Sequence, residues 1–171
     1  PYGALSLNFN SIKLTVWPAA KPGQTASATL TPSSGYAGVK SAVKTVKGDQ
    51  SALLHISKKA HPTGGEIVTV NGTIGVSSPA KSRYVNVANP ALYTGEVLKD
   101  YIQRLGVKMT GQVVKGKVPA GATSLVEYNS LPLSLIVYWL NKYSNNFMAE
   151  QLGLALGAHK FGPPGTREKG L

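Results

Sequence analysis

The chain has 171 residues, of which 42% are hydrophobic, and it carries a formal net charge of +11. That length is enough for one domain with a buried core, or for one domain and part of another. The chain has no cysteine, which excludes disulfide bonds and thiolate metal sites. No apolar run approaches the ~20 residues that a transmembrane helix needs, and no basic-then-apolar leader is present.

The excess of positive charge favours anionic partners, such as nucleic acid, anionic lipid or an acidic cell-wall polymer. A solvated basic face without a partner is the alternative. The chain has only three arginines, Arg83, Arg104 and Arg167, and no basic stretch interleaved with aromatic residues. Nucleic-acid readers depend on arginine and on stacking, so we expect no nucleic-acid partner.

The first part of the chain has the pattern of short strands. Residues 4–16 alternate, with Leu5, Leu7 and Phe9 on one face, and a hairpin tip or a bulge is expected near Asn10 and Ser11. Pro18 to Gly23 is expected to be a turn. Further strands are predicted at residues 26–30, 39–46, 52–57, 66–74 and 84–87. Short strands at this spacing predict a small sandwich or a curved antiparallel sheet.

The period changes from two to about 3.6 at Asn89-Pro90, where Asn89 suits an N-cap and Pro90 a first helical residue. The helix should end at Gly106. Its buried stripe is predicted to consist of Leu98, Tyr101, Ile102 and Leu105. Strands are then expected at residues 107–115 and 124–128.

Two further helices follow. The first should open near Ser130 and Pro132 and stop at residues 141–144, and its buried face is predicted to be Leu133, Ile136, Val137 and Leu140. The second should run from about Asn146 to Leu156, be buried nearly all round, and end at Gly157. A loop over residues 157–165 is expected next. Thr166 is then expected to be the N-cap of another helix.

A polar turn, Ser144-Asn145-Asn146, separates these two apolar helices. In a turn, the side chains of Ser144 and Asn146 can both point into one cleft. A hydroxyl can relay a proton, and an amide can donate to a carbonyl and accept from an N–H group. This pair therefore suits acyl transfer. Spacing alone leaves helix capping by Ser144 and Asn145 as the alternative.

The wider segment, residues 141–152 (NKYSNNFMAEQL), resembles the second active-site motif of the D-alanyl-D-alanine carboxypeptidase/endopeptidase family, the class C low-molecular-mass penicillin-binding proteins. Other stretches are similar to the same family in the same order: residues 2–11, 89–93, 118–121 and 128–133. In that last stretch the family commonly has a His two residues before the Ser, where this chain has Tyr128.

The resemblance implies a serine enzyme whose site uses Ser-x-x-Lys, Ser-x-Asn and Lys-Thr-Gly motifs, with no cofactor. Ser144 would pass a proton towards the leaving amine. Asn146 would bond the penultimate amide of the substrate and help to orient the catalytic lysine. The implied partners are peptidoglycan stem peptides, β-lactam inhibitors and the rest of the catalytic domain, in this or another chain. The implied location is periplasmic or exported.

The other two motifs are not convincing in this chain. Ser41 to Lys44 and Ser78 to Lys81 match Ser-x-x-Lys by letter, but the chemistry needs Ser and Lys one helical turn apart on one face. Ser41 lies in a strand pattern and Ser78 in a loop. No Lys-Thr-Gly occurs. We therefore expect a fragment of a longer enzyme, inactive alone.

The predicted fold class is α+β. Residues 1–128 are expected to be the latter part of a β-rich insertion with short, mainly antiparallel strands. Residues 129–171 are expected to return into an incomplete β-lactamase/transpeptidase-like catalytic domain. A second hypothesis is a non-catalytic basic β-rich module that binds cell-wall polymer or a protein partner.

Three further expectations concern individual side chains. His55, His61 and His159 share no ligand spacing, so we expect no metal site. Glu150 is expected to hydrogen-bond the motif turn from behind. The two tryptophans, Trp17 and Trp139, are expected to be core or interdomain anchors.

Overall fold

A computed structural model of the chain describes residues 2–49, 52–62 and 64–171. The chain divides into two compact units. The first unit comprises residues 5–115. The second comprises residues 116–171 together with residues 2–4. The domain boundary predicted at residues 128 and 129 stays a prediction.

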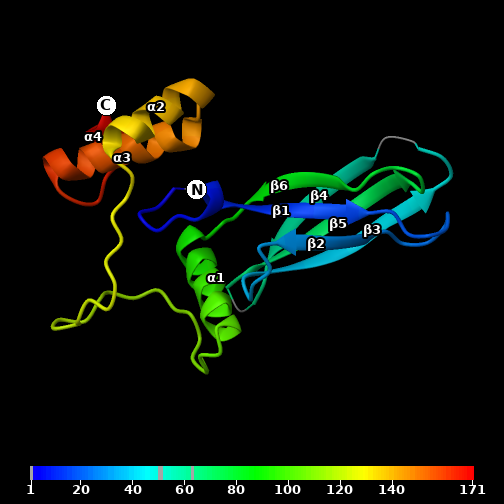
Figure 1. The fold of residues 1–171 in the computed structure, drawn as a ribbon, viewed down its shortest axis with the longest axis horizontal. Coiled ribbons are helices and arrows are strands. Elements are labelled where there is room, and N and C mark those ends of the chain that lie inside the picture. Colours follow the sequence, from blue (N-terminus) through cyan, green and yellow to red (C-terminus); the bar gives the residue numbers. More distant parts are fainter. Residues whose placement is uncertain (1, 50–51, 63) are drawn as a thin grey trace. The chain divides into compact units, whose positions relative to one another are not determined.

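The first unit contains six strands in two three-stranded sheets (Figure 1). The strands are β1 (Ser11–Trp17), β2 (Ser27–Thr31), β3 (Ala37–Val46), β4 (Leu53–Ala60), β5 (Glu66–Gly75) and β6 (Lys81–Asn86). In the first sheet, β1 pairs antiparallel with both β2 and β6. In the second sheet, β5 pairs parallel with β3 and antiparallel with β4. The predicted α+β class, with mainly antiparallel short strands followed by helices, is confirmed.

Alternation along β1 and β5 builds the core of the first unit. Leu14 and Val16 of β1 are fully buried, as are Val70 and Ile74 of β5. Both sheets contribute to one hydrophobic cluster. Burying such side chains stabilises a fold by about 1.5–3 kcal/mol each, so this unit has a core of its own.

A buried polar network joins β5 to the segment that leads into helix α1 (Pro90–Arg104). Tyr36, 1% exposed, donates its hydroxyl to Glu66 Oε2 at 2.8 Å, and the backbone N–H of Ala88 donates to the same oxygen at 3.0 Å. The N–H of Asn89 donates to the Tyr36 hydroxyl at 3.0 Å. Lys58 Nζ lies 3.1 Å from Glu66 Oε1. Every polar atom of the Glu66 carboxylate is therefore paired.

The second unit contains three helices, α2 (Leu133–Tyr143), α3 (Asn146–Phe161) and α4 (Arg167–Gly170). Among the described residues of this unit, only Gly157 is buried. A Cβ on Gly157 would lie 2.8 Å from Lys169 Cβ and 2.9 Å from Gly170 N, so the glycine allows α4 to approach α3 closely.

The prediction for residues 4–10 was wrong. These residues form no strand. A short 3-10 turn, Asn8–Asn10, precedes β1, and all three of its residues have positive φ, at 50°, 53° and 53°. The strand begins at Ser11. Phe9 is 58% exposed instead of lying on a buried face.

The predicted strands at residues 107–115 and 124–128 were also wrong, because both stretches are irregular. The first lies along α1, where Lys99 Nζ donates to the Gly111 carbonyl and Gln103 Nε2 donates to the Met109 carbonyl. Side-chain bonds from a helix thus satisfy carbonyls that a sheet partner would otherwise have to satisfy.

The start and end of α1 were predicted correctly. Asn89 Oδ1 accepts from the Leu92 N–H, and Gly106 has φ +89°. The predicted buried stripe was wrong, because Leu98, Tyr101 and Leu105 are 58%, 56% and 82% exposed. The buried residues of this helix are Pro90, Tyr93 and Val97. The Tyr93 ring meets Tyr36 edge-on at 5.4 Å, so contact with the sheets selects the buried face.

The extents of the later helices also differ from expectation. The helix α3 continues through Gly157 to Phe161, so the loop predicted over 157–165 begins only at Gly162. The predicted buried face of α2 is not buried, since Leu133 is 62% and Val137 is 39% exposed. The predicted all-round burial of α3 was wrong too. The Thr166 cap is confirmed by its bond from the Lys169 N–H at 3.3 Å.

Candidate functional site

The turn between α2 and α3 has a defined backbone. The helix α2 ends at Tyr143, and Ser144 has φ 49° and ψ 48°, in the left-handed region. The backbone N–H of Ser144 donates to the Leu140 carbonyl, and so does that of Asn145 at 3.2 Å. A left-handed residue of this kind satisfies free carbonyls at a helix end and reverses the chain within one residue.

The side chains of Ser144, Asn145 and Asn146 in the turn differ in their hydrogen bonding. Asn145 Oδ1 accepts from the Met148 N–H at 3.0 Å and is therefore the N-cap of α3. Ser144 contributes to the C-cap of α2 through its backbone only. The Ser144 hydroxyl and the Asn146 amide are exposed and make no hydrogen bond to another group in the described part of the chain. The capping alternative thus applies to the side chain of Asn145 and leaves the other two available.

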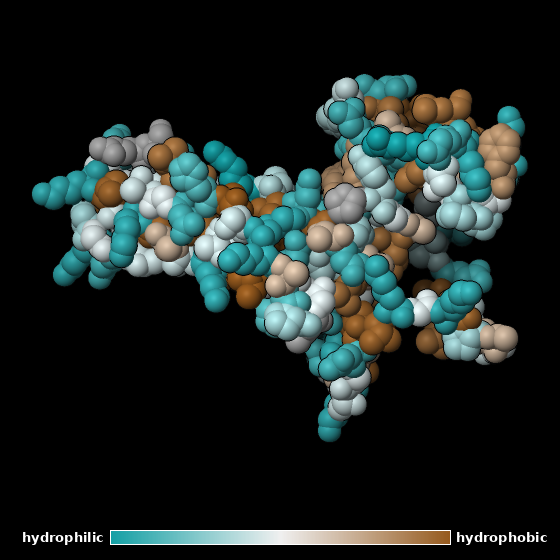
Figure 2. Space-filling model, turned by 180° about the vertical axis from the view of Figure 1, so that it is seen from behind, coloured by the Kyte–Doolittle hydropathy of each residue, from teal (hydrophilic) through white to brown (hydrophobic). Residues whose placement is uncertain are grey.

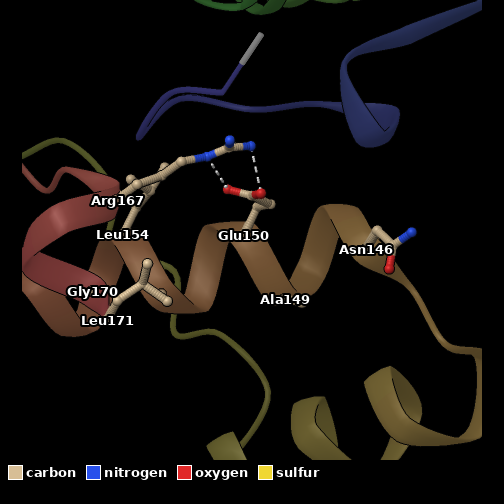
Figure 3. Close-up of a pocket in the computed structure, with 8 residues that line it drawn as sticks. Asn146, Ala149, Glu150, Leu154, Arg167, Gly170 and Leu171 are labelled. Atoms are coloured by element: carbon tan, nitrogen blue, oxygen red, sulfur yellow. Dashed lines mark hydrogen bonds and ion pairs between the residues drawn. The ribbon is translucent and has the colours of Figure 1, made fainter.

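A cavity of about 400 Å³ lies along α3 and α4, with Asn146 at one end (Figure 3). Ala149, Gly153 and Leu154 line it from α3, and Arg167 and Leu171 from the C-terminal segment. Ser144 is not among its lining residues. The structure therefore places Asn146 in a cavity and Ser144 on the exposed turn beside it.

The expectation for Glu150 was wrong. Its carboxylate does not bond the motif turn. It forms a two-pronged ion pair with Arg167, with Nε to Oε2 at 3.0 Å and Nη2 to Oε1 at 2.5 Å (Figure 3). The hydrogen bond from Arg167 to Glu150 raises the pKa of the guanidinium above its ordinary value. Glu150 thus connects α3 to α4.

The N-terminal residues of the second unit also pack on α3, a contact that no sequence pattern predicts. The Tyr2 ring lies 5.7 Å from the Phe147 ring, directly after the motif. Gln151 Nε2 donates to the Gly3 carbonyl at 2.9 Å. The Arg167 guanidinium lies 5.9 Å from the centre of the Tyr2 ring. A segment more than 140 residues upstream therefore supports the first turns of α3.

The helix α2 carries an aromatic cluster around Trp139, the residue that is expected from the sequence to be a core or interdomain anchor. The Trp139 ring stacks on Tyr143 at 5.5 Å and meets Tyr138 edge-on at 5.1 Å. Lys142 Nζ lies 5.1 Å from the centre of the Trp139 ring. Cation–π contacts of this kind favour a fixed ammonium position. Trp17, at the end of β1, is 40% exposed and is not part of the core.

The two Ser-x-x-Lys matches lack catalytic geometry. Ser41 lies on β3 and donates its hydroxyl to the Ala26 carbonyl at 2.7 Å. Ser78 lies in the turn before β6, and Lys81 begins that strand. Neither pair lies on a helix. Within the described ranges no group of three or more His, Cys, Asp or Glu side chains could hold a metal ion. No helix in those ranges is long and apolar enough to cross a membrane.

Comparisons with known proteins agree on one family. The sequence profile of the D-Ala-D-Ala carboxypeptidase 3 (S13) family matches residues 1–171. The chain is 30% identical over 162 residues to the D-alanyl-D-alanine carboxypeptidase of Actinomadura sp. (strain R39). That match covers 93% of this chain and 29% of the relative, so the chain spans less than a third of the length of that protein.

Two crystal structures of penicillin-binding protein 4 from Haemophilus influenzae have a similar fold. The structure in complex with a β-lactam matches with a TM-score of 0.73 at 17% identity, covering 98% of this chain and 38% of that one. The other matches with a TM-score of 0.74 at 16% identity and covers 36% of that chain. By the profile match over its whole length, the chain belongs to the D-Ala-D-Ala carboxypeptidase 3 (S13) family.

Proposed function

We propose that this chain is the middle part of a serine D-alanyl-D-alanine carboxypeptidase/endopeptidase that cleaves peptidoglycan stem peptides through an acyl-enzyme. The nucleophilic serine and the catalytic lysine would come from a Ser-x-x-Lys motif elsewhere in the enzyme. The serine oxygen would attack the carbonyl between two D-alanines. The amine would leave with a proton, and water would then hydrolyse the ester. A β-lactam would acylate the same serine.

Ser144 and Asn146 are assigned the roles that their chemistry allows. The Ser144 hydroxyl can accept a proton from one neighbour and give one to a leaving amine. The Asn146 amide can donate to a substrate carbonyl and accept from its N–H. One observation supports this proposal most: Asn145 alone caps α3 with its side chain, so the other two polar side chains of the turn have no structural hydrogen bond to maintain.

The test is the rate of acylation by a fluorescent penicillin in the longer enzyme that carries this segment. Ser144→Ala and Asn146→Ala should each lower the rate by roughly 10²–10⁴, as for loss of a proton-transfer or electrostatic group. Ser134→Ala is the matched control, since this residue is exposed and lies on α2 outside the motif. The control should acylate at the wild-type rate.

A further variant separates chemistry from backbone geometry. Because Ser144 has positive φ, Ser144→Gly removes the hydroxyl while relaxing the backbone. The proposal expects Ser144→Gly to be as slow as Ser144→Ala. Wild-type acylation in Ser144→Gly would show that the position serves only the turn, and wild-type rates in both alanine variants would remove the site assignment.

The 171-residue chain alone should be inactive. It should bind no fluorescent penicillin covalently, because Ser41 and Ser78 lie outside any helical Ser-x-x-Lys arrangement. Covalent labelling at Ser41, Ser78 or Ser144 would contradict the proposal. The proposed location is periplasmic or otherwise exported, since the substrate lies outside the cytoplasm. The rest of the catalytic domain is the proposed partner of α2 and α3.

A second candidate function rests on the distribution of charge. Residues 5–115 contain thirteen basic and four acidic residues, a net charge of +9 out of +11. Hydrophilic side chains cover much of the strand region on the face shown in Figure 2. We propose that this unit binds a cell-wall polymer. Cosedimentation with peptidoglycan that weakens with salt would support this function, and no cosedimentation at low salt would remove it.

A further inference from the structure

The outer face of the first sheet has an unusual composition. Its inner face carries the core residues Ile12, Leu14 and Val16, so the alternate residues of β1 point outward. Strand pairing extends this outer face into cross-strand rows. Lys13 lies between Thr31 and Tyr84, and the next row along is Thr15 between Thr29 and Ser82.

Aromatic rings flank these polar rows. Tyr84 is 74% exposed. Trp17 lies two rows beyond Lys13 along β1, is 40% exposed and pairs with Ser27. At about 3.3 Å per residue, the Lys13 row and Trp17 lie roughly 13 Å apart. Between them, the hydroxyls of Thr15 and Ser82 are 3.1 Å apart and bond to each other. The face therefore alternates rings and hydroxyls over several residues.

The left-handed turn before β1 adds a third ring. Phe9 has φ 53° and ψ 29°, and this conformation is unfavourable in free energy for a residue with a large side chain. Its ring is 58% exposed. The turn is held by its neighbour Asn10, which is 1% exposed, and by the bond from the Val87 N–H to the Asn10 carbonyl at 2.8 Å. Strain maintained by surrounding structure is a feature of ligand sites.

A cavity of about 500 Å³ lies at this end of the sheet, within the size range of small-ligand sites. Phe9 and Tyr84 supply its aromatic walls and Lys13 its charge. Asn8, Ser11 and Thr31 add an amide and two hydroxyls. All these residues belong to the first unit.

This combination matches the chemistry of a sugar chain. A pyranose has apolar C–H faces, which pack on aromatic rings, and hydroxyl edges, which bond to hydroxyls and amides. The ammonium of Lys13, in a unit of net charge +9, complements a carboxylate on the sugar. A flat protein partner would instead be expected to meet an apolar centre with a polar rim, whereas here the row between the rings carries the exposed Thr29 and the half-buried Ser82 on either side of the buried Thr15.

We infer that the outer face of the β2-β1-β6 sheet, with Phe9, Tyr84 and Lys13 at its cavity, binds a glycan chain that carries carboxylates. The inference rests on the second candidate function for the class of polymer, and it goes beyond that candidate by naming the site. It is independent of Ser144 and Asn146, which belong to the other unit.

The experiment titrates the 171-residue chain with two soluble probes, by calorimetry and by amide chemical shifts. One probe is a neutral N-acetylglucosamine tetramer. The other is a peptide-free glycan of the same length with lactyl carboxylates on alternate sugars. Phe9→Ala and Tyr84→Ala should each weaken binding of both probes by roughly 5- to 10-fold, the loss expected for one aromatic contact. Tyr101→Ala is the matched control, since this ring is 56% exposed on α1.

Lys13→Ala should weaken binding of the carboxylated probe several-fold and leave the neutral probe unchanged, while Lys40→Ala on β3 should change neither. Ser144→Ala should bind both probes as wild type does. Equal binding by wild type, Phe9→Ala and Tyr84→Ala would overturn the site while leaving the second candidate function standing. Binding of polyphosphate but of neither glycan would overturn the glycan assignment. Unchanged amide shifts in β5, a core strand of the other sheet, establish that each variant is folded.

Discussion

The two units of the chain contain comparable local signals and very different burial. Among the described residues, the fourteen buried members of the hydrophobic core all lie in the first unit. In the described part of the second unit, Gly157 alone is buried, although α2 and α3 together contain 27 residues. Caps, an αL residue and an ion pair are present there. The difference shows that local interactions define where these helices begin and end, while their apolar side chains are not buried in a core within this unit.

The largest test of this contrast is a pair of leucine truncations. Leu14→Ala, at a fully buried position, should destabilise the first unit by about 3 kcal/mol or more, through lost burial and a cavity. Leu133→Ala, at a 62% exposed position on α2, should cost the second unit under ~0.5 kcal/mol. Residue-resolved amide hydrogen exchange reports each unit separately. Equal losses in the two units would mean that α2 is buried in solution.

The Lys58–Glu66 and Arg167–Glu150 ion pairs should also contribute unequally to stability, with the larger contribution in the first unit. Glu66 is 7% exposed and accepts bonds from Tyr36, Ala88 and Lys58, so Glu66→Gln should cost about 2 kcal/mol. Glu150→Gln breaks the pair with the well-exposed Arg167 and should cost less than about 1 kcal/mol. Hydrogen exchange in β5 and in α3 is the measurement. A larger loss of exchange protection in α3 than in β5 would contradict the expected difference between the two units.

The buried network should also make the first unit sensitive to acid. Burial raises the pKa of Glu66, but bonds from Ala88, Tyr36 and Lys58 outweigh it and hold the pKa below the ordinary value of 4.5. The depressed pKa means that the unfolded chain binds a proton first. The stabilisation is therefore complete above the ordinary pKa and declines as the pH falls through the lower folded value.

This acid effect is checked by urea unfolding of the first unit between neutral pH and pH 3, followed by the amide signals of β5. In Glu66→Gln the decline in stability should be shallower than in wild type. Parallel declines in the two proteins would exclude Glu66 as its source.

At the smallest scale the two units should behave alike. Asn89 and Asn145 cap α1 and α3 with side-chain bonds of 3.3 and 3.0 Å. Replacing either with Ala should cost about 1 kcal/mol of helix stability, since capping is local and does not depend on a core. Exchange of the first-turn amides of each helix measures the effect. A tenfold difference between the two variants would show that capping depends on burial here.

The caps were the part of the fold that the sequence predicted best. Asn89, Thr166 and the polar turn at residues 144–146 were identified because each cap depends on a few neighbouring residues. The buried side of α1 was not identified, since Tyr93 and Val97 are selected by the sheets and Tyr36. The sequence predicts a helix end at Gly157, but α3 continues past it, and the close contact with Lys169 and Gly170 is what requires a glycine there.

Local sequence patterns do not predict which strands pair. The parallel pairing of β3 with β5 bypasses β4, which follows β3 in the chain, so sequence order does not indicate it. Residues 107–115 have strand composition but pair with no strand, and α1 side chains bond two of their carbonyls instead. At the candidate site, the role of Arg167 depends on its distance to Glu150, which spacing does not provide.

The left-handed backbone at Ser144 has a consequence for how this position can evolve. A residue there must tolerate φ near 50°, which disfavours β-branched side chains. Threonine, the other residue that could keep an aliphatic hydroxyl, is therefore disfavoured by the main chain, and glycine, the easiest choice for the main chain, has no hydroxyl. Any lineage that needs a hydroxyl at this turn is left with serine, so geometry and chemistry together narrow the choice to one amino acid.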